Sequence, residues 1–160
     1  MIFGSQRDFS LFRLINRELL RNIIEQEVLY YKIITETSTN IYGEALEKDY
    51  YEPVKLNCLI IRGDQVTTQE DMGRDVTRAV SFAFLRDDLV DVDVVPEMGD
   101  IIVWSENYYE ADTVRENQLF LGKDNNYSLT DYGSQFGSSV SLIVDCHYTR
   151  VEKTGITSLR

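Results

Sequence analysis

The sequence predicts a mainly β protein, a small β-barrel or sandwich of about seven strands with one N-terminal amphipathic helix. Three observations support this fold class: a helical apolar repeat near the start, a change to strand-like alternation after Gln26, and turn signals that divide the rest into short segments. With 160 residues and 43% hydrophobic content, the chain fits one domain with its own core. We therefore expect a single domain over 1–160, with the helix at about 8–25, a β domain at about 27–151 and a C-terminal tail at 152–160.

The helix is expected because Phe12, Ile15, Leu19 and Ile23 recur at spacings of three and four residues. This is the period of an amphipathic helix, in which one side is apolar and the other polar.

The polar side of this helix carries Arg13, Arg17 and Arg21 at intervals of four residues, so they stack along one side. Two interpretations fit. The arginines can form a solvated face with local pairing, for example between Glu18 and Arg21. Alternatively, they form a basic ridge that meets an acidic neighbour, such as another copy of the protein.

Short segments rich in β-branched and aromatic residues predict the strands. We expect strands at 27–35, 54–60, 75–85, 101–104, 108–115, 118–121 and 140–149. The segment 75–85 also has Val76, Val80 and Ala83 at helical spacing, but its composition favours a strand. We expect the acidic segment 87–100 to be a connection, and 128–139, rich in Ser, Gly and Asp, to be a loop.

The net charge of the chain limits the classes of partner that it can bind. It has 16 basic and 27 acidic residues, a net charge of -11. That surplus argues against a protein that holds nucleic acid through its phosphates, and against docking on an anionic membrane. No apolar run approaches the ~20 residues that span a bilayer, and the start of the chain lacks the pattern of a secretory signal. We expect a soluble protein with no membrane partner.

Most catalytic constellations are missing from the sequence. The single histidine, His147, follows Cys146 on the same strand, and successive strand side chains point to opposite faces, so the two cannot act together. Cys58 and Cys146 both lie in apolar strand-like segments and are expected to be small buried hydrophobic residues, although a disulfide stays open. We assign no catalytic residue, no metal ligand and no cofactor.

Four acidic residues, Asp87, Asp88, Asp91 and Asp93, cluster in one segment. They lack the spacing and the glycine of an EF-hand calcium loop. A pair of carboxylates that meet in the fold could still serve a glycosidase-type reaction, so an enzyme stays open as an alternative.

Several local motifs follow one another in a specific order. They are Val28–Lys32 in a tyrosine-bearing strand, Tyr42–Ala45, the turn and strand Pro96–Trp104, the pair Tyr109–Glu110, and Phe120–Gly122. In this order the segment 25–122 resembles the neck proteins of contractile-tailed, T4-like phages, the head-closure or stopper component of the head-to-tail connector. The chain differs from that family in lacking counterparts of its longer N- and C-terminal extensions.

The resemblance implies a non-enzymatic ring of most commonly six copies, placed between the portal or adaptor protein and the tail terminator or tail tube. Its bore would pass the phage DNA without specific binding and retain the genome until ejection. The protein would reside in the neck of the virion after assembly in the host cytoplasm. Alternatives are a tail-terminator or adaptor ring of the same virion and, in a different class, a small carboxylate-based enzyme or ligand-binding β-barrel.

Two sets of residues take roles in this hypothesis. The arginine ridge of Arg13, Arg17 and Arg21 would contact a neighbouring subunit or ring, where charge complementarity sets register. The bore would be lined by Asp87, Asp88, Asp91 and Asp93, with Tyr132 and Gln135 from the loop 128–139. Acidic side chains repel DNA and let it slide, because like charges do not grip phosphates.

Overall fold

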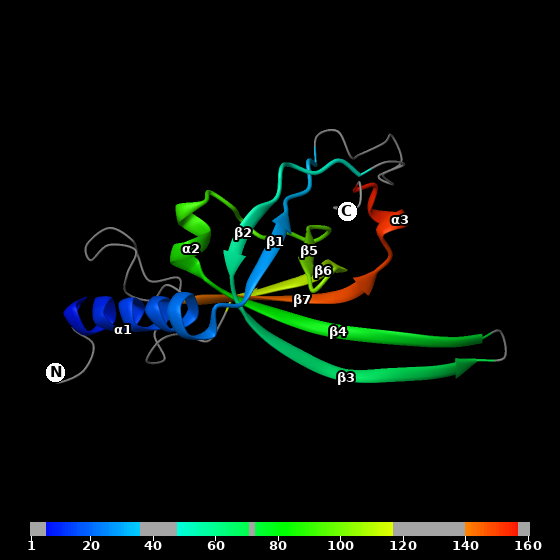
Figure 1. Ribbon diagram of the computed structural model, residues 1–160, viewed down its shortest axis with the longest axis horizontal. Coiled ribbons are helices and arrows are strands. Elements are labelled where there is room, and N and C mark those ends of the chain that lie inside the picture. Colours follow the sequence, from blue (N-terminus) through cyan, green and yellow to red (C-terminus); the bar gives the residue numbers. More distant parts are fainter. Residues whose placement is uncertain (1–5, 36–47, 71–72, 117–139, 157–160) are drawn as a thin grey trace.

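A computed structural model describes residues 6–35, 48–70, 73–116 and 140–156 (Figure 1). In chain order the elements are α1 (Gln6–Glu18), the π-helical turn η1 (Leu19–Ile24), β1 (Glu27–Tyr31), β2 (Val54–Asn57), β3 (Leu59–Glu70), β4 (Gly73–Leu85), α2 (Arg86–Asp91), β5 (Ile101–Trp104), β6 (Asn107–Glu116), β7 (Ser141–Thr149) and α3 (Val151–Thr154). The prediction of a mainly β fold with seven strands and an N-terminal helix is confirmed.

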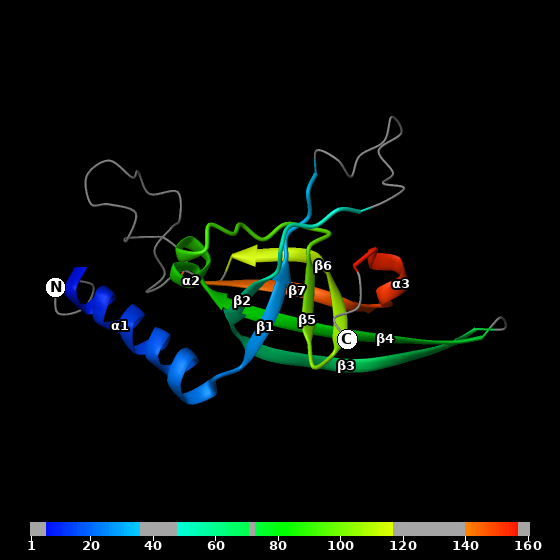
Figure 2. The same cartoon turned by 45° about the horizontal axis from the view of Figure 1, so that its top comes forward.

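All seven strands form one antiparallel sheet in the order β2-β1-β5-β6-β7-β4-β3. The strands at the two ends of this order, β2 and β3, are consecutive in the sequence and separated by Cys58 alone. The sheet therefore curves until its two edges meet at that residue (Figure 2). Since β2 and β3 do not pair with each other, the sheet is not closed into a barrel.

The main core fills the concave side of this sheet. Inward side chains alternate along each strand, as the strand period requires; examples are Phe82 and Phe84 on β4, and Val144 and Cys146 on β7, all at most 2% exposed. Cys146 and Cys58 are buried free thiols, as expected, and burial raises the pKa of Cys58 to about 12.

A second, smaller cluster lies on the other side of β1, β5 and β6. It is built from Tyr31, Ile101 and Tyr108, and Val151 and Ile156 from the end of the chain pack against it. Part of the expected C-terminal tail is thus attached to the body and forms α3.

The turn before β5 is held by the fully buried carboxylate of Asp100. Its oxygens accept hydrogen bonds from the backbone N–H groups of Ile33 (2.9 Å) and Glu97 (2.7 Å) and from the Tyr30 hydroxyl (2.5 Å), and the Lys32 ammonium lies 3.3 Å away. A buried charge needs such partners. Asp100 therefore ties the turn of the Pro96–Trp104 motif to the end of β1.

Three local predictions differ from the structure. The acidic segment 87–100 is not only a connection, because it contains α2; six residues are too few for a helical period to stand out in the sequence. The expected strand 54–60 is interrupted at Cys58. Its first part is β2, and its second part begins β3, which continues to Glu70 through a bulge between Arg62 and Gln65. Strand β6 begins at Asn107, one residue before the expected strand 108–115, so Ser105 and Glu106 form the β5–β6 turn.

Segment 75–85 is a strand, as predicted, because it lies within β4. The expected strand at 118–121 and the expected loop at 128–139 lie outside the described residues.

Candidate functional site

The N-terminal helix leaves large apolar side chains in solvent. Five of them, here called the apolar stripe, are between 41% and 75% exposed: Leu11, Leu14, Ile15, Leu19 and Ile23. In the described part of α1 and η1, Leu20 alone is buried. A surface helix normally turns such a side toward the core, so this helix is oriented in the opposite sense.

The opposite side of the helix is bound to α2 by charge. Three arginines meet three aspartates in what we call the Arg–Asp ladder: Arg13, Arg17 and Arg21 with Asp87, Asp88 and Asp91. The Arg13 Nε donates to Asp87 Oδ2 at 2.7 Å, and Arg21 Nη2 donates to Asp88 Oδ1 at 2.6 Å. Arg17 Nε lies 2.9 Å from the same Asp88 oxygen.

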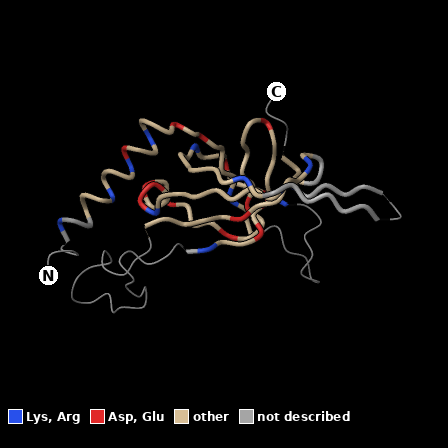
Figure 3. The backbone as a smooth tube through the Cα atoms, turned by 90° about the horizontal axis from the view of Figure 1, so that it is seen from below, with Lys and Arg blue, Asp and Glu red and all other residues tan. Residues whose placement is uncertain are grey.

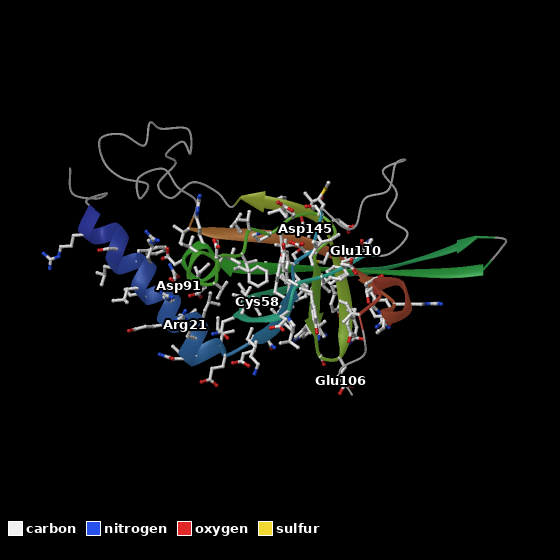
Figure 4. The ribbon with its side chains drawn as sticks, turned by 90° about the horizontal axis from the view of Figure 1, so that it is seen from above. Arg21, Cys58, Asp91, Glu106, Glu110 and Asp145 are labelled. Carbon is white, nitrogen blue, oxygen red and sulfur yellow. The ribbon has the colours of Figure 1, made fainter. Side chains whose placement is uncertain are left out.

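The ladder determines which way the helix faces. At 3.6 residues per turn, Arg13 and Arg17 project from the side opposite Leu11 and Ile15. Figure 3 shows basic positions recurring along α1 and the acidic α2 beside it, and in Figure 4 Arg21 points toward α2. Charged contacts thus hold the helix on the body while its apolar stripe faces outward.

Part of the Arg–Asp ladder is shielded from solvent. Asp88 is 4% exposed, and its second oxygen, Oδ2, has no hydrogen-bond donor among the described residues. Burial lowers the pKa of Arg13, and the nearby positive charges of Arg86 and Arg17 lower it further. The ladder is therefore an attachment with some electrostatic cost.

The structure places the predicted site residues differently from the hypothesis. Helix α2 of the same chain is an acidic neighbour of the arginine ridge, so two residue sets that were assigned to separate surfaces lie together. Asp88 does not line a bore, because it is buried against Arg17 and Arg21. Asp87 and Asp91 are also in ion pairs with arginine.

Of the three remaining predicted bore residues, the structure describes Asp93 alone. Asp93 is exposed, has a positive φ of 54°, and takes part in no ion pair with a described residue. Tyr132 and Gln135 lie outside the described residues.

A sequence signal for the ladder was present. The arginines recur every four residues, and Asp87, Asp88 and Asp91 are spaced by one, three and four residues, a pattern that gathers them on one side of a short helix. Because α2 was not recognised as a helix, this complementarity was missed. The exposure of the apolar stripe had no sequence signal, since periodicity does not say what a side packs against.

A separate cavity of about 270 Å³ lies at the base of the β3–β4 hairpin. Its lining includes the guanidinium groups of Arg62 and Arg78 and the rings of Trp104 and Tyr109; Arg62 lies 4.7 Å above the Trp104 ring. None of the described residues that line this cavity carries a carboxylate.

The single histidine and the metal-ligand groups can be judged only where the structure describes the chain. His147 Nδ1 lies 2.7 Å from Asp112 on the outer side of β7, on the opposite face from Cys146 as expected. Within the residues that the structure covers, no group of histidine, cysteine and acidic side chains could hold a metal ion. None of the described helices is both long and apolar enough to cross a bilayer.

Scans against protein-family models and curated proteins find no match for this chain.

Proposed function

We propose that this protein is a structural component of a tailed-phage neck, a ring of the head-closure type between the portal or adaptor and the tail. The observation that carries the proposal is the apolar stripe, held away from the body by the Arg–Asp ladder. Exposed apolar patches of this kind mark protein interaction sites. A chain whose most distinctive surface is built for contact fits an assembly role.

Residues of the motifs that resemble the neck proteins stabilise this fold, which supports the proposal that the chain shares a scaffold with that family. Asp100 of the Pro96–Trp104 motif is the buried anchor of its turn. Tyr109 is buried in the main core, and Glu110 forms an ion pair with Lys48. These are positions at which a change of residue type would disturb the fold itself.

The charge distribution also supports a channel component. The ladder balances three arginines against three aspartates, so it does not account for the net charge of -11. Among the described residues, exposed acids such as Asp93 and Glu106 lie outside the ladder and contribute to this surplus. A bore that passes DNA would then be lined by acidic residues outside the ladder, with Asp93 the retained candidate.

The proposal is tested by locating the protein in particles. Antibodies raised against the purified chain should bind tailed particles encoded by the same genome at the junction of head and tail, as seen by electron microscopy with gold labelling. Labelling at the far end of the tail, on the capsid surface, or of no particle at all would contradict it. A label displaced by one ring height would instead favour the adaptor or tail-terminator alternative.

A further inference from the structure

The described residues cover only part of the outer side of the sheet. Over β1, β5 and β6, Tyr50, Val151 and Ile156 pack on the second cluster. Over β3 and β4, Leu59 and Ile61 are 43% and 47% exposed, and none of the described helices lies against that side (Figure 1).

The uncovered part combines large apolar side chains with small ones. On the paired strands β3 and β4, Leu59 lies opposite Ala83, and Ile61 lies opposite Ser81. On its other side Ala83 lies opposite Ile143 of β7. The Ser81 hydroxyl is satisfied by the Asp145 carboxylate at 2.6 Å. We call this surface the bare face. Leu59 and Ile61, with the small residues Ala83 and Ser81 beside them, form an apolar part that suits the larger side chains of a helix. On the β7 side this part is bounded by the ion pair of Asp145 with Arg115.

We propose that the apolar stripe of one copy packs on the bare face of the next copy, which makes the contact that closes the ring. This inference rests on the proposed function and names the partner of the stripe. Every chain carries both surfaces, and the ladder turns the stripe away from its own body. A contact between two different surfaces of identical chains is heterologous, the type from which rings form.

The area of the stripe agrees with such a contact. Its five side chains present roughly 400 Å² of apolar surface, taking about 150 Å² for a large apolar side chain in full exposure. A standard interface buries about 800 Å² per partner, and somewhat over half of this is apolar. The stripe therefore supplies close to the apolar area that one partner of a stable pair needs. On the bare face Leu59 and Ile61 present only roughly 140 Å² by the same measure, so the contact between two isolated chains is expected to be weak and to gain from closure of the ring.

The test uses one damaged surface at a time. Leu14→Glu places a charge in the stripe, and Ile61→Glu places one in the bare face; both side chains are about half exposed, so each variant keeps its core. Val95→Glu is the control, because Val95 is an exposed apolar residue (69%) that lies on neither surface. Circular dichroism confirms that all four proteins are folded before their masses are compared.

Sedimentation from about 10 μM to 1 mM should show the wild type and Val95→Glu associating, and each single-surface variant remaining monomeric, a loss of at least about 100-fold in association. An equimolar mixture of Leu14→Glu and Ile61→Glu should form dimers and stop there. One intact stripe then meets one intact bare face, and the two remaining surfaces are damaged.

Three results would overturn the inference. They are a wild type that is monomeric up to about 1 mM, an Ile61→Glu variant that associates like the wild type, and a mixture that does not dimerise. The second result would indicate a symmetric contact between stripes, because the stripe of Ile61→Glu is intact. Failure of this inference can be distinguished from failure of the proposed function. Gold labelling at the neck does not depend on where the stripe docks, and self-association in solution does not depend on the neck.

Discussion

Asp100 carries its carboxylate in the interior of the protein, where donors from β1, the following segment and its own turn surround it. Removing a group from a satisfied buried network leaves the remaining partners unpaired, and this costs more than the hydrogen bonds themselves contribute. The residue therefore matters for stability far more than its distance from any proposed interface suggests.

Replacing Asp100 by Asn should lower the free energy of unfolding by about 2–4 kcal/mol, because the amide NH₂ turns a donor toward groups that are themselves donors. Urea unfolding at pH 7 measures the change. Glu97→Gln is the control: its carboxylate is half exposed and pairs with Lys32, so it should cost less than about 1 kcal/mol. Equal effects for both variants would contradict the role of Asp100.

At the scale of elements, α1 and α2 are joined by side chains rather than by a shared apolar core. The contacts run from Arg13 at one end to Arg21 at the other, and several of the arginine side chains remain partly exposed. Salt screens exposed charges, so this attachment is weaker than the packing inside the sheet.

Reversing Arg13, Arg17 and Arg21 to Glu should release the helix from α2, because three carboxylates would then face three aspartates. Hydrogen exchange should become at least about tenfold faster in α1, while amides of β4 and β7 keep their protection. The same variant should also fail to assemble into necks. Unchanged exchange in α1 would show that the ladder does not hold the helix; the wild type in 1 M salt provides a milder comparison.

In the β5–β6 turn, two residues adopt a backbone conformation that is unfavourable for residues other than glycine or asparagine. Ser105 and Glu106, which forms its tip (Figure 4), both have positive φ, at 50° and 63°. A two-residue hairpin turn of this kind favours Asn-Gly. The Ser105→Asn, Glu106→Gly double variant should therefore raise the melting temperature by roughly 2–4 °C, equivalent to about 1 kcal/mol. A lower melting temperature would mean that the Ser105 or Glu106 side chain makes a contribution of its own.

At the scale of the whole molecule, the curved sheet encloses acidic groups that stay protonated. Burial raises the pKa of Cys58 to about 12 and raises the pKa of Cys146 and Tyr30 as well. A group with a raised pKa in the folded state contributes stability that is complete below its unfolded pKa and is lost as pH rises toward the folded value.

The free energy of unfolding should therefore be level near pH 7 and fall above about pH 8, because unfolded thiols have a pKa near 8.5 and begin to ionise there. Once the unfolded thiols are ionised, each contributes a slope of about 1.4 kcal/mol per pH unit. Urea titrations from pH 7 to 10.5 measure the slope, and Cys58→Ala should make it shallower by about that amount. A stability that does not change up to pH 10.5 would contradict the burial of these groups.

Much of this molecule follows from local sequence patterns. The helix near 8–25 and strands at the positions of β1, β2, β4, β5, β6 and β7 were predicted, because a repeat of 3.6 or 2 residues is visible in a short window. The buried thiols followed in the same way. Most of β3 was not predicted. Helix α2 was missed, since a single turn and a half shows no period.

The sequence by itself determined the elements and the acidic surplus, whereas the tertiary structure decided what the elements face. Arg13 and Asp87 are 74 positions apart, and no local pattern states that they meet. The same holds for Asp100 and Ile33, separated by 67 positions. A helical period shows that a helix has an apolar side, but only the pairing of its polar side with α2 turns the apolar stripe outward, because the helix has two sides and the body can bind just one.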